Sequence, residues 1–244
     1  MVEVNFAHLI RGYRAVLHDR PPSQFRRTGA IHQAGLFRRL IPELSPELPE
    51  TLLPEDQVDH PETLFTVLRR GMPELRSERP ALVISSTSWT ADEDFSLLLT
   101  ALDSYQAAIN SGTKLPKVLV VITGKGGLRA AFEQAVLERE GTKWTDVVVR
   151  CHFLPAKDYP TLLGCADLGV SLHTSSSGRD LPMKVVDMFG CGVPVLAKGF
   201  ACVDELVKHG HNGLVFDTGE ELGRQLIVSL SCSDTFWFRR DRAD

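Results

Sequence analysis

The chain has 244 residues, which is enough to bury the core of one large domain. Its formal net charge of -4 gives no electrostatic support for binding to nucleic acid, and no apolar run approaches the roughly eighteen residues of a membrane-spanning helix. The first residues also lack the basic-then-apolar layout of a signal peptide. We therefore expect no nucleic-acid partner, no transmembrane segment and no signal peptide.

The first 79 residues differ in kind from the rest of the chain. A helical or mixed pattern over residues 6–17 is followed by Asp19-Arg-Pro-Pro, and five prolines then fall within residues 42–62. Closely repeated prolines interrupt helices and central strands. We interpret residues 1–79 as a linker region and predict that 42–62 is exposed and partly disordered.

From residue 80 onward, short apolar runs alternate with segments of helical periodicity. The expected strands are 81–86, 117–123, 147–153, 168–173, 194–197 and 213–216. The expected helices are 92–110, 128–140, 157–165, 202–208 and 219–230, together with a short helix within 174–197 that ends at Gly192 and Pro194. Such alternation is typical of right-handed βαβ units around a parallel sheet. We predict a Rossmann-like α/β domain over 80–232, with helices on both faces of the sheet, and a divergent tail over 233–244.

The segment 174–197 carries the most chemical information. A loop that contains Ser175, Ser176, Ser177 and Gly178 precedes a short apolar helix. If Pro182 lies in the first turn, Asp180, Lys184 and Asp187 are spaced i, i+4 and i+7 and form one charged stripe. Helix N–H groups and Lys184 suit a phosphate, and Asp187 suits ribose hydroxyls. Alternatively, an Asp180–Lys184 pair only stabilises the helix and Asp187 is solvated.

The place of this segment in the predicted sheet favours the ligand-binding interpretation. Ligands of open parallel sheets bind beyond the carboxyl ends of the strands. Five such ends fall at 85–90, 123–127, 153–156, 173–179 and 197–201. The charged segment follows one of them.

The glycine-rich turn after the second strand of this domain has two interpretations. Gly124, Lys125 and Gly126 follow the pattern G-x-G-G, which is neither a dinucleotide fingerprint nor a Walker A loop. The turn is either a tight connection between strand and helix, or a loop that lets a nucleotide approach the backbone near Lys125.

Three further side chains are candidates for the lining of the site. Trp89 either stacks on a sugar or base at the cleft edge or packs under its loop. His173 ends a strand inside the predicted cleft, where it could donate to a phosphate or sugar. Glu205 either faces the same edge or only caps an exposed helix.

Several consecutive motifs resemble the GT-B glycosyltransferases and, within them, the mannosyltransferases of dolichol-linked oligosaccharide assembly. The motifs are the runs 79–95, 121–126, 158–170, 172–191 and 205–216, and the likeness extends from Arg79 to Leu226. The resemblance implies transfer of mannose from GDP-mannose to GlcNAc2-diphosphodolichol with inversion, without a cofactor or an obligatory metal. It also implies the cytosolic face of the endoplasmic reticulum membrane and proximity to other lipid-linked oligosaccharide transferases.

The resemblance assigns roles to individual residues. It implies that Asp187 binds the ribose, while Lys184 and the loop 175–178 neutralise the diphosphate. Asp180 stands beside the first acid of the E-x7-E pattern of the family, whose position is occupied by Arg179, so the role of Asp180 stays open.

The family pattern also includes an N-terminal domain that this chain does not match. That domain supplies most of the acceptor site, and we expect the catalytic residues there. We therefore expect that the chain alone does not transfer mannose. The alternative is a truncated, inactive paralogue that only binds GDP or GDP-mannose.

Overall fold

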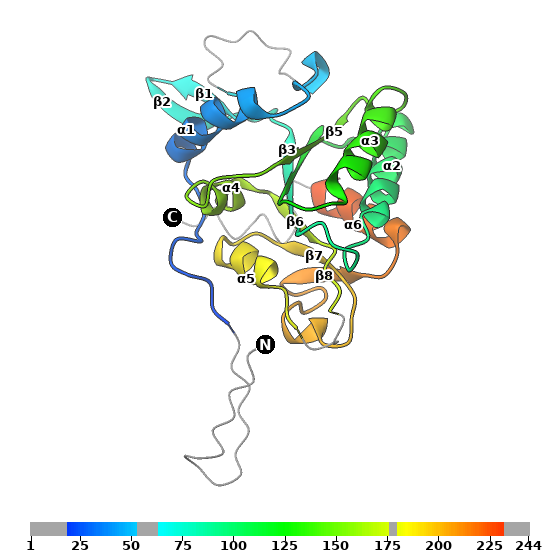
Figure 1. Cartoon of the computed structure of the whole chain (residues 1–244). Coiled ribbons are helices and arrows are strands. Elements are labelled where there is room, and N and C mark those ends of the chain that lie inside the picture. Colours follow the sequence, from blue (N-terminus) through cyan, green and yellow to red (C-terminus); the bar gives the residue numbers. More distant parts are fainter. Residues whose placement is uncertain (1–18, 53–62, 176–179, 232–244) are drawn as a thin grey trace, which may run out of the picture.

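The computed structural model describes residues 19–52, 63–175 and 180–231 (Figure 1). Its centre is a parallel sheet of six strands in the order β5-β4-β3-β6-β7-β8. The strands are β3 Ala81–Ser86, β4 Val118–Thr123, β5 Val147–His152, β6 Leu168–Ser171, β7 Val195–Lys198 and β8 Gly213–Phe216. Counted from β3, the order is 3-2-1-4-5-6, that of doubly wound Rossmann sheets. The predicted fold class is confirmed.

Helices cover both faces of the sheet. On one face lie α2 (Ser96–Asn110), α3 (Arg129–Glu140) and α6 (Gly219–Ser231), and on the other lie α4 (Tyr159–Cys165) and α5 (Met183–Gly190). Side chains of a strand alternate between faces. In β3, Val83 accordingly packs in the hydrophobic cluster on the side of α2, α3 and α6, while Leu82 and Ile84 pack in the cluster on the side of α4 and α5.

The right-handed crossovers leave half of one face without a helix of this domain. The connections β3-α2-β4 and β4-α3-β5 place both helices on one face, and after the switch to β6 the helices α4 and α5 lie on the other. The opposite face of β3, β4 and β5 is therefore left for another part of the chain to cover.

Residues 19–52 and 63–76, which we call the cover segment, fill this space. The segment holds helix α1 (Ala30–Leu40), 3-10 turns η1 (Ile41–Glu43) and η2 (Glu50–Leu52), and a hairpin of β1 (Thr66–Arg69) and β2 (Met72–Leu75). Its buried side chains share one cluster with those of the sheet. They are Phe25, Leu36, Phe37, Leu40, Leu44, Leu52, Leu64 and Phe65 from the segment, and Leu82, Ile84, Leu119, Val121 and Val148 from the sheet.

Most residues in the described part of the predicted exposed linker 42–62 are exposed, but two of its leucines lie in the core. Leu44 and Leu52 are buried, with exposed fractions of 3% and 2%. Arg150 of β5 is also buried, pairs with Glu140, and donates to the carbonyls of Pro46 and Glu47. The prolines do limit regular structure here, but they do not prevent burial. Residues 53–62, and the pattern predicted over 6–17, lie outside the described residues.

Two predicted helices differ from those in the structure. Helix α2 begins at Ser96 rather than at residue 92, which leaves the acidic residues 92–94 in the preceding loop. The helix expected over 202–208 is only the 3-10 turn η3, Val203–Glu205. None of the helices that the structure describes is both long and apolar enough to cross a membrane.

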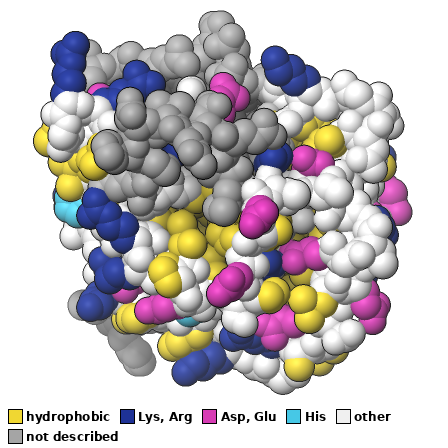
Figure 2. Space-filling model, turned by 90° about the horizontal axis from the view of Figure 1, so that it is seen from above, with side chains coloured by type: hydrophobic (Ala, Val, Ile, Leu, Met, Phe, Trp, Pro, Cys, Tyr) yellow, Lys and Arg dark blue, Asp and Glu magenta, His cyan; other side chains and the backbone are white. Residues whose placement is uncertain are grey.

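The face that carries α1 and the hairpin mixes apolar, basic and acidic side chains (Figure 2). Hydrophobic side chains reach the surface near the middle of this view, and Lys and Arg side chains lie along its left edge. The exposed large apolar residues of the cover segment are Ile31, Leu68, Met72 and Leu75. The segment is therefore buried on its sheet side only.

Candidate functional site

A pocket lies beyond the carboxyl ends of β3, β4 and β5, where ligands of parallel sheets bind. Its volume is about 320 Å³. Strands β3 and β4 and the segment directly after β5 contribute to its wall, together with the start of α4 and the first turn of α5. The lining residues are Ser86, Thr87, Thr123, Gly124, Phe153, Leu154, Ala156, Tyr159 and Lys184. Hydroxyl groups and a single ammonium group therefore give the pocket its polar character.

Lys184 reaches this pocket from α5 but pairs with a residue outside the predicted stripe. Its ammonium nitrogen lies 3.0 Å from an oxygen of Glu93, whose side chain is 2% exposed. Glu93 also accepts hydrogen bonds from the Thr87 hydroxyl and from the Ser88 backbone N–H. Lys184 is thus tied to the loop between β3 and α2.

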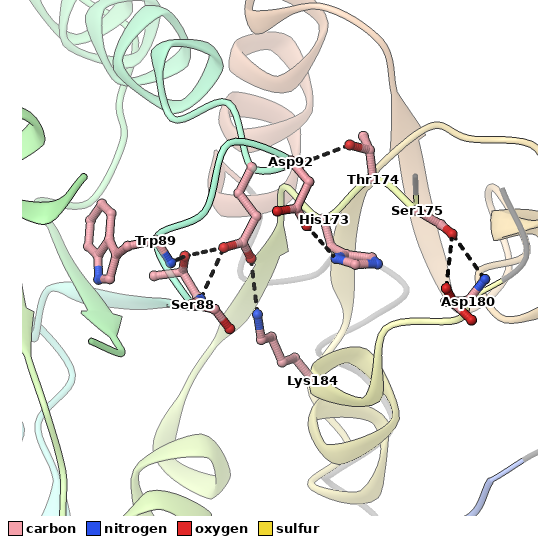
Figure 3. Close-up of polar contacts among 10 residues, drawn as sticks. Ser88, Trp89, Asp92, His173, Thr174, Ser175, Asp180 and Lys184 are labelled. Atoms are coloured by element: carbon pink, nitrogen blue, oxygen red, sulfur yellow. Dashed lines mark hydrogen bonds and ion pairs between the residues drawn. The ribbon is translucent and has the colours of Figure 1, made fainter. Parts of the chain in front are cut away.

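The same loop contacts the residues that follow β6 (Figure 3). Asp92 lies 3.5 Å from Nδ1 of His173, and its backbone carbonyl accepts a hydrogen bond of 2.7 Å from the Thr174 hydroxyl. A hydrogen bond with the Thr90 side chain lowers the pKa of Asp92, and electrostatic interactions with His173 and Lys184 lower it further. His173 therefore contacts the loop between β3 and α2 but is absent from the pocket lining, and its Nε2 is buried without a partner in the described part of the chain.

The predicted charged stripe is wrong at its first member. Pro182 precedes the helix with an extended ψ of 111°, and α5 begins only at Met183, so Asp180 lies outside it. The backbone N–H of Asp180 donates to the Ser175 hydroxyl, 3.1 Å away. An Asp180–Lys184 staple is therefore absent, since the carboxylate partner of Lys184 is Glu93.

Asp187 lies one turn after Lys184 on α5 and is half-buried. Burial raises the pKa of its carboxyl from 3.8 to about 6. The described residues offer this side chain no hydrogen bond or ion pair of their own. A half-buried carboxylate without a partner is available to hydroxyl groups of a ligand, which is what the ribose assignment requires.

The glycine turn is shaped by its contact with the loop after β3. A Cβ on Gly124 would lie 1.9 Å from the Thr87 carbonyl oxygen, and one on Gly126 would lie 2.2 Å from that of Ser88. Gly124 also has a φ of 145° and lines the pocket. Lys125 instead lies 3.8 Å above the Phe153 ring. The glycines thus permit tight packing, and Gly124 also forms pocket wall.

Trp89 does not line the cleft. Its side chain is 3% exposed and stacks on Phe95 with ring centres 4.5 Å apart, next to Phe132. Figure 3 shows the ring directed away from Lys184. Of its two interpretations, packing under the loop is therefore the one that the structure supports.

Among the described residues, Asp180 and Asp187 are absent from the pocket lining. Glu205 is exposed in η3 and is absent from the lining. Ser176, Ser177 and Gly178 lie outside the described residues, so their assignment to the donor site stays a prediction. Within the described ranges, no group of three or more His, Cys, Asp or Glu side chains could hold a metal ion.

Glu93 and Tyr159 are the site residues that the sequence reasoning missed. Tyr159 lines the pocket and its hydroxyl donates a hydrogen bond of 3.0 Å to the Ser86 hydroxyl. Glu93 belongs to the acidic run 92–94, which the sequence pattern assigns to the first turn of a helix and the structure places in the loop before α2. The available signal was an acidic run directly after the carboxyl end of a strand.

Known proteins similar to this chain are glycosyltransferases. The model of the family described as glycosyl transferases group 1 matches residues 79–231. The human protein named chitobiosyldiphosphodolichol beta-mannosyltransferase is 49% identical over 222 residues, covering 89% of this chain and 47% of its own length. The protein named UDP-glycosyltransferase TURAN from Arabidopsis thaliana is 42% identical, covering 89% of this chain and 50% of its own length. The chain thus spans about half the length of these relatives.

Solved structures agree with the fold. An S. aureus TarM mutant, crystallised in complex with fondaparinux, alpha-GlcNAc-glycerol and UDP, superposes with a TM-score of 0.52 at 13% identity. The match covers 65% of this chain and 30% of that protein. At this identity the likeness supports the Rossmann-like architecture alone.

Proposed function

Because the chain belongs to the group 1 glycosyl transferases, we propose that its pocket binds the nucleotide-sugar donor of a beta-mannosyltransferase that acts on chitobiosyldiphosphodolichol. The observation that carries the proposal is the position of Lys184, on the rim of a pocket at the carboxyl ends of the strands. Asp187 follows on the same helix. An ammonium and a carboxylate one turn apart suit a diphosphate and a ribose.

The proposed donor is GDP-mannose. Lys184 and the loop 175–178 would neutralise the diphosphate, the leaving group when the sugar is transferred with inversion. Fixed positive charge at a developing anion lowers the barrier of such a step. We propose that this lysine takes the role that a metal has in other transferases, so that the site needs no obligatory metal or other cofactor.

The proposed acceptor is a dolichyl-diphosphate-linked GlcNAc2, which places the protein at the cytosolic face of the endoplasmic reticulum membrane. Other transferases of lipid-linked oligosaccharide assembly would be its neighbours. The acceptor site and the catalytic base belong, in this proposal, to the half of the relatives' length that the chain does not match. The chain alone would then bind the donor without transferring mannose.

A second candidate concerns the nucleotide. The similarity to a protein named UDP-glycosyltransferase favours a test of uridine as well as guanosine nucleotides. A chain that binds GDP but transfers nothing, even beside a complete acceptor domain, would be the inactive paralogue instead.

Calorimetric titration of the purified chain with GDP, UDP and GDP-mannose tests the proposal. We expect GDP to bind more tightly than UDP, and Lys184→Ala and Asp187→Ala each to weaken GDP binding about tenfold or more, because each removes a charged hydrogen-bonding partner. Lys208→Ala, at an exposed lysine outside the pocket, is the matched control. Equal titration curves for all variants would refute the assignment of Lys184 and Asp187 to the nucleotide site. Tighter binding of UDP than of GDP would mean that the donor is a UDP-sugar rather than GDP-mannose.

A further inference from the structure

The turn of residues 90–93, which we call the acidic turn, contacts both ends of the loop that carries the predicted phosphate-binding residues. Before that loop, His173 and Thr174 contact Asp92. After it, Lys184 contacts Glu93. Figure 3 shows these side chains converging on the turn from the end of β6 and from α5. The consecutive acids Asp92 and Glu93 therefore connect the residues that follow β6 with helix α5. The residues that they contact, His173 and Lys184, are eleven positions apart in the sequence.

Glu93 is the more deeply buried of the two acids. Its side chain is 2% exposed, against 38% for Asp92. Both of its carboxylate oxygens are used: one accepts from Lys184, and the other from the Thr87 hydroxyl and from the Ser88 N–H. A buried charge is tolerated when it is paired and hydrogen-bonded in this way. Glu93 is thus a fixed point from which the lysine is held.

The pairing leaves part of the ammonium group available. A lysine ammonium has three donors, and Glu93 is its one hydrogen-bond partner within the described ranges. Lys184 lines the pocket together with Thr87, whose hydroxyl donates to the same carboxylate. Without this contact the long side chain would be free to sample many rotamers.

We propose that Glu93 is a positioning residue for the donor diphosphate. It does not touch the nucleotide; it holds the ammonium of Lys184 at the rim of the pocket and fixes that ammonium relative to Thr87 and Ser88, which follow β3. The inference rests on the proposed function and adds to it a residue that acts through Lys184.

The direction in which Glu93→Gln changes GDP affinity distinguishes a positioning role of Glu93 from a purely electrostatic effect of its charge. A carboxylate beside a diphosphate site repels the ligand, so if charge alone mattered, Glu93→Gln would tighten GDP binding. If Glu93 positions Lys184, the same change weakens GDP binding about tenfold, the size expected when one charged hydrogen bond is lost. In a Lys184→Met background, Glu93→Gln should cause no further loss, because the residue through which Glu93 acts is absent.

A measurement without nucleotide tests the positioning directly. The rate at which an amine-reactive acetylating reagent labels Lys184, followed by mass spectrometry, should rise several-fold in Glu93→Gln and stay closer to the original rate in Glu93→Asp. Glu140→Gln is the matched control, since it removes a carboxylate from the ion pair with buried Arg150. It should lower the melting temperature and leave both Lys184 labelling and GDP affinity unchanged.

The outcomes are distinguishable. Tighter GDP binding by Glu93→Gln, or an unchanged rate of Lys184 labelling, overturns the positioning role. Failure of the unmodified chain to bind GDP overturns the proposed function, whereas the labelling rates still decide whether Glu93 holds Lys184.

Discussion

A buried carboxylate lies beside each end of β3, Asp167 at the amino end and Glu93 at the carboxyl end, and the two pair with different kinds of cation. At the amino end, Asp167 receives both arms of the Arg79 guanidinium, each at 2.6 Å, and the backbone N–H of Leu82 at 2.8 Å. At the carboxyl end, Glu93 receives a hydroxyl, a backbone N–H and the ammonium of Lys184. Both carboxylates are almost fully buried, with side chains 4% and 2% exposed.

The difference lies in the cation. The guanidinium is a planar fork that matches a carboxylate with two parallel hydrogen bonds, and this geometry leaves Asp167 satisfied. The ammonium is a point charge with three donors at the edge of a pocket. The amino end of the strand is therefore built to hold the fold together, while the carboxyl end keeps a cation ready for an anion.

The largest effect is expected from Asp167→Ala. The change leaves the Arg79 guanidinium and the Leu82 N–H without their acceptor in a buried place, which costs about 3–5 kcal/mol of unfolding free energy. Chemical denaturation followed by circular dichroism measures this loss. The GDP affinity of the folded fraction should stay unchanged. A variant that keeps its stability but loses GDP binding would remove the contrast between the two ends.

A smaller, pH-dependent effect is expected from Asp187→Asn. Since burial raises the pKa of Asp187 to about 6, the folded chain binds a proton more tightly than the unfolded chain does, and the stability from this group is lost as the pH rises through about 6. Asparagine stays neutral, so the variant should melt on the order of 2 °C higher at pH 7.5 and show no advantage at pH 4. Thermal melts across this range provide the measurement.

Protonation of Asp187 should also change the affinity for GDP. GDP binding to the unmodified chain should weaken as the pH falls through about 6, because a protonated carboxyl is a poorer acceptor for ribose hydroxyls. Asp187→Asn should bind weakly at every pH. A higher melting temperature together with unchanged GDP affinity would make Asp187 a strained structural group rather than part of the site.

The smallest effect is expected from Lys125→Ala. This lysine lies over the half-exposed Phe153 ring rather than over a carboxylate, and such a contact contributes about 0.5–1 kcal/mol. GDP affinity should change by less than about threefold, measured by titration beside Lys184→Ala. A loss as large as that of Lys184→Ala would show that the glycine turn also supplies a cation to the nucleotide.

The sheet could be predicted from sequence because buried parallel strands are continuous apolar runs between breakers. The runs 81–86 and 213–216 were predicted at the observed bounds, and the glycines and prolines around them mark the turns. The position of Lys184 at the pocket could be predicted from its place after a strand end, whereas the ribose role of Asp187 stays a prediction. The start of α5 could not be fixed, because Pro182 fits either the first turn or the position before it.

The residues that were missed depend on contacts distant in sequence. Glu93 and Lys184 are 91 positions apart, and nothing local distinguishes Glu93 from its acidic neighbours. Burial of Leu44 and Leu52 likewise depends on a sheet face that lies later in the chain. Yet the need for a cover was implicit in the connectivity, since right-handed crossovers from β3 to β5 place both helices on one face.

The cover segment has a consequence for how the domain can be moved between proteins. The region that matches the family begins at residue 79, but the apolar face formed by Leu82, Ile84, Leu119 and Val121 is completed by residues before that point. A chimaera joined at residue 79 would expose this apolar sheet face to solvent. A junction placed before the cover segment would keep the face buried. The border of the recognisable family sequence and the border of the folding unit are thus different places in this chain.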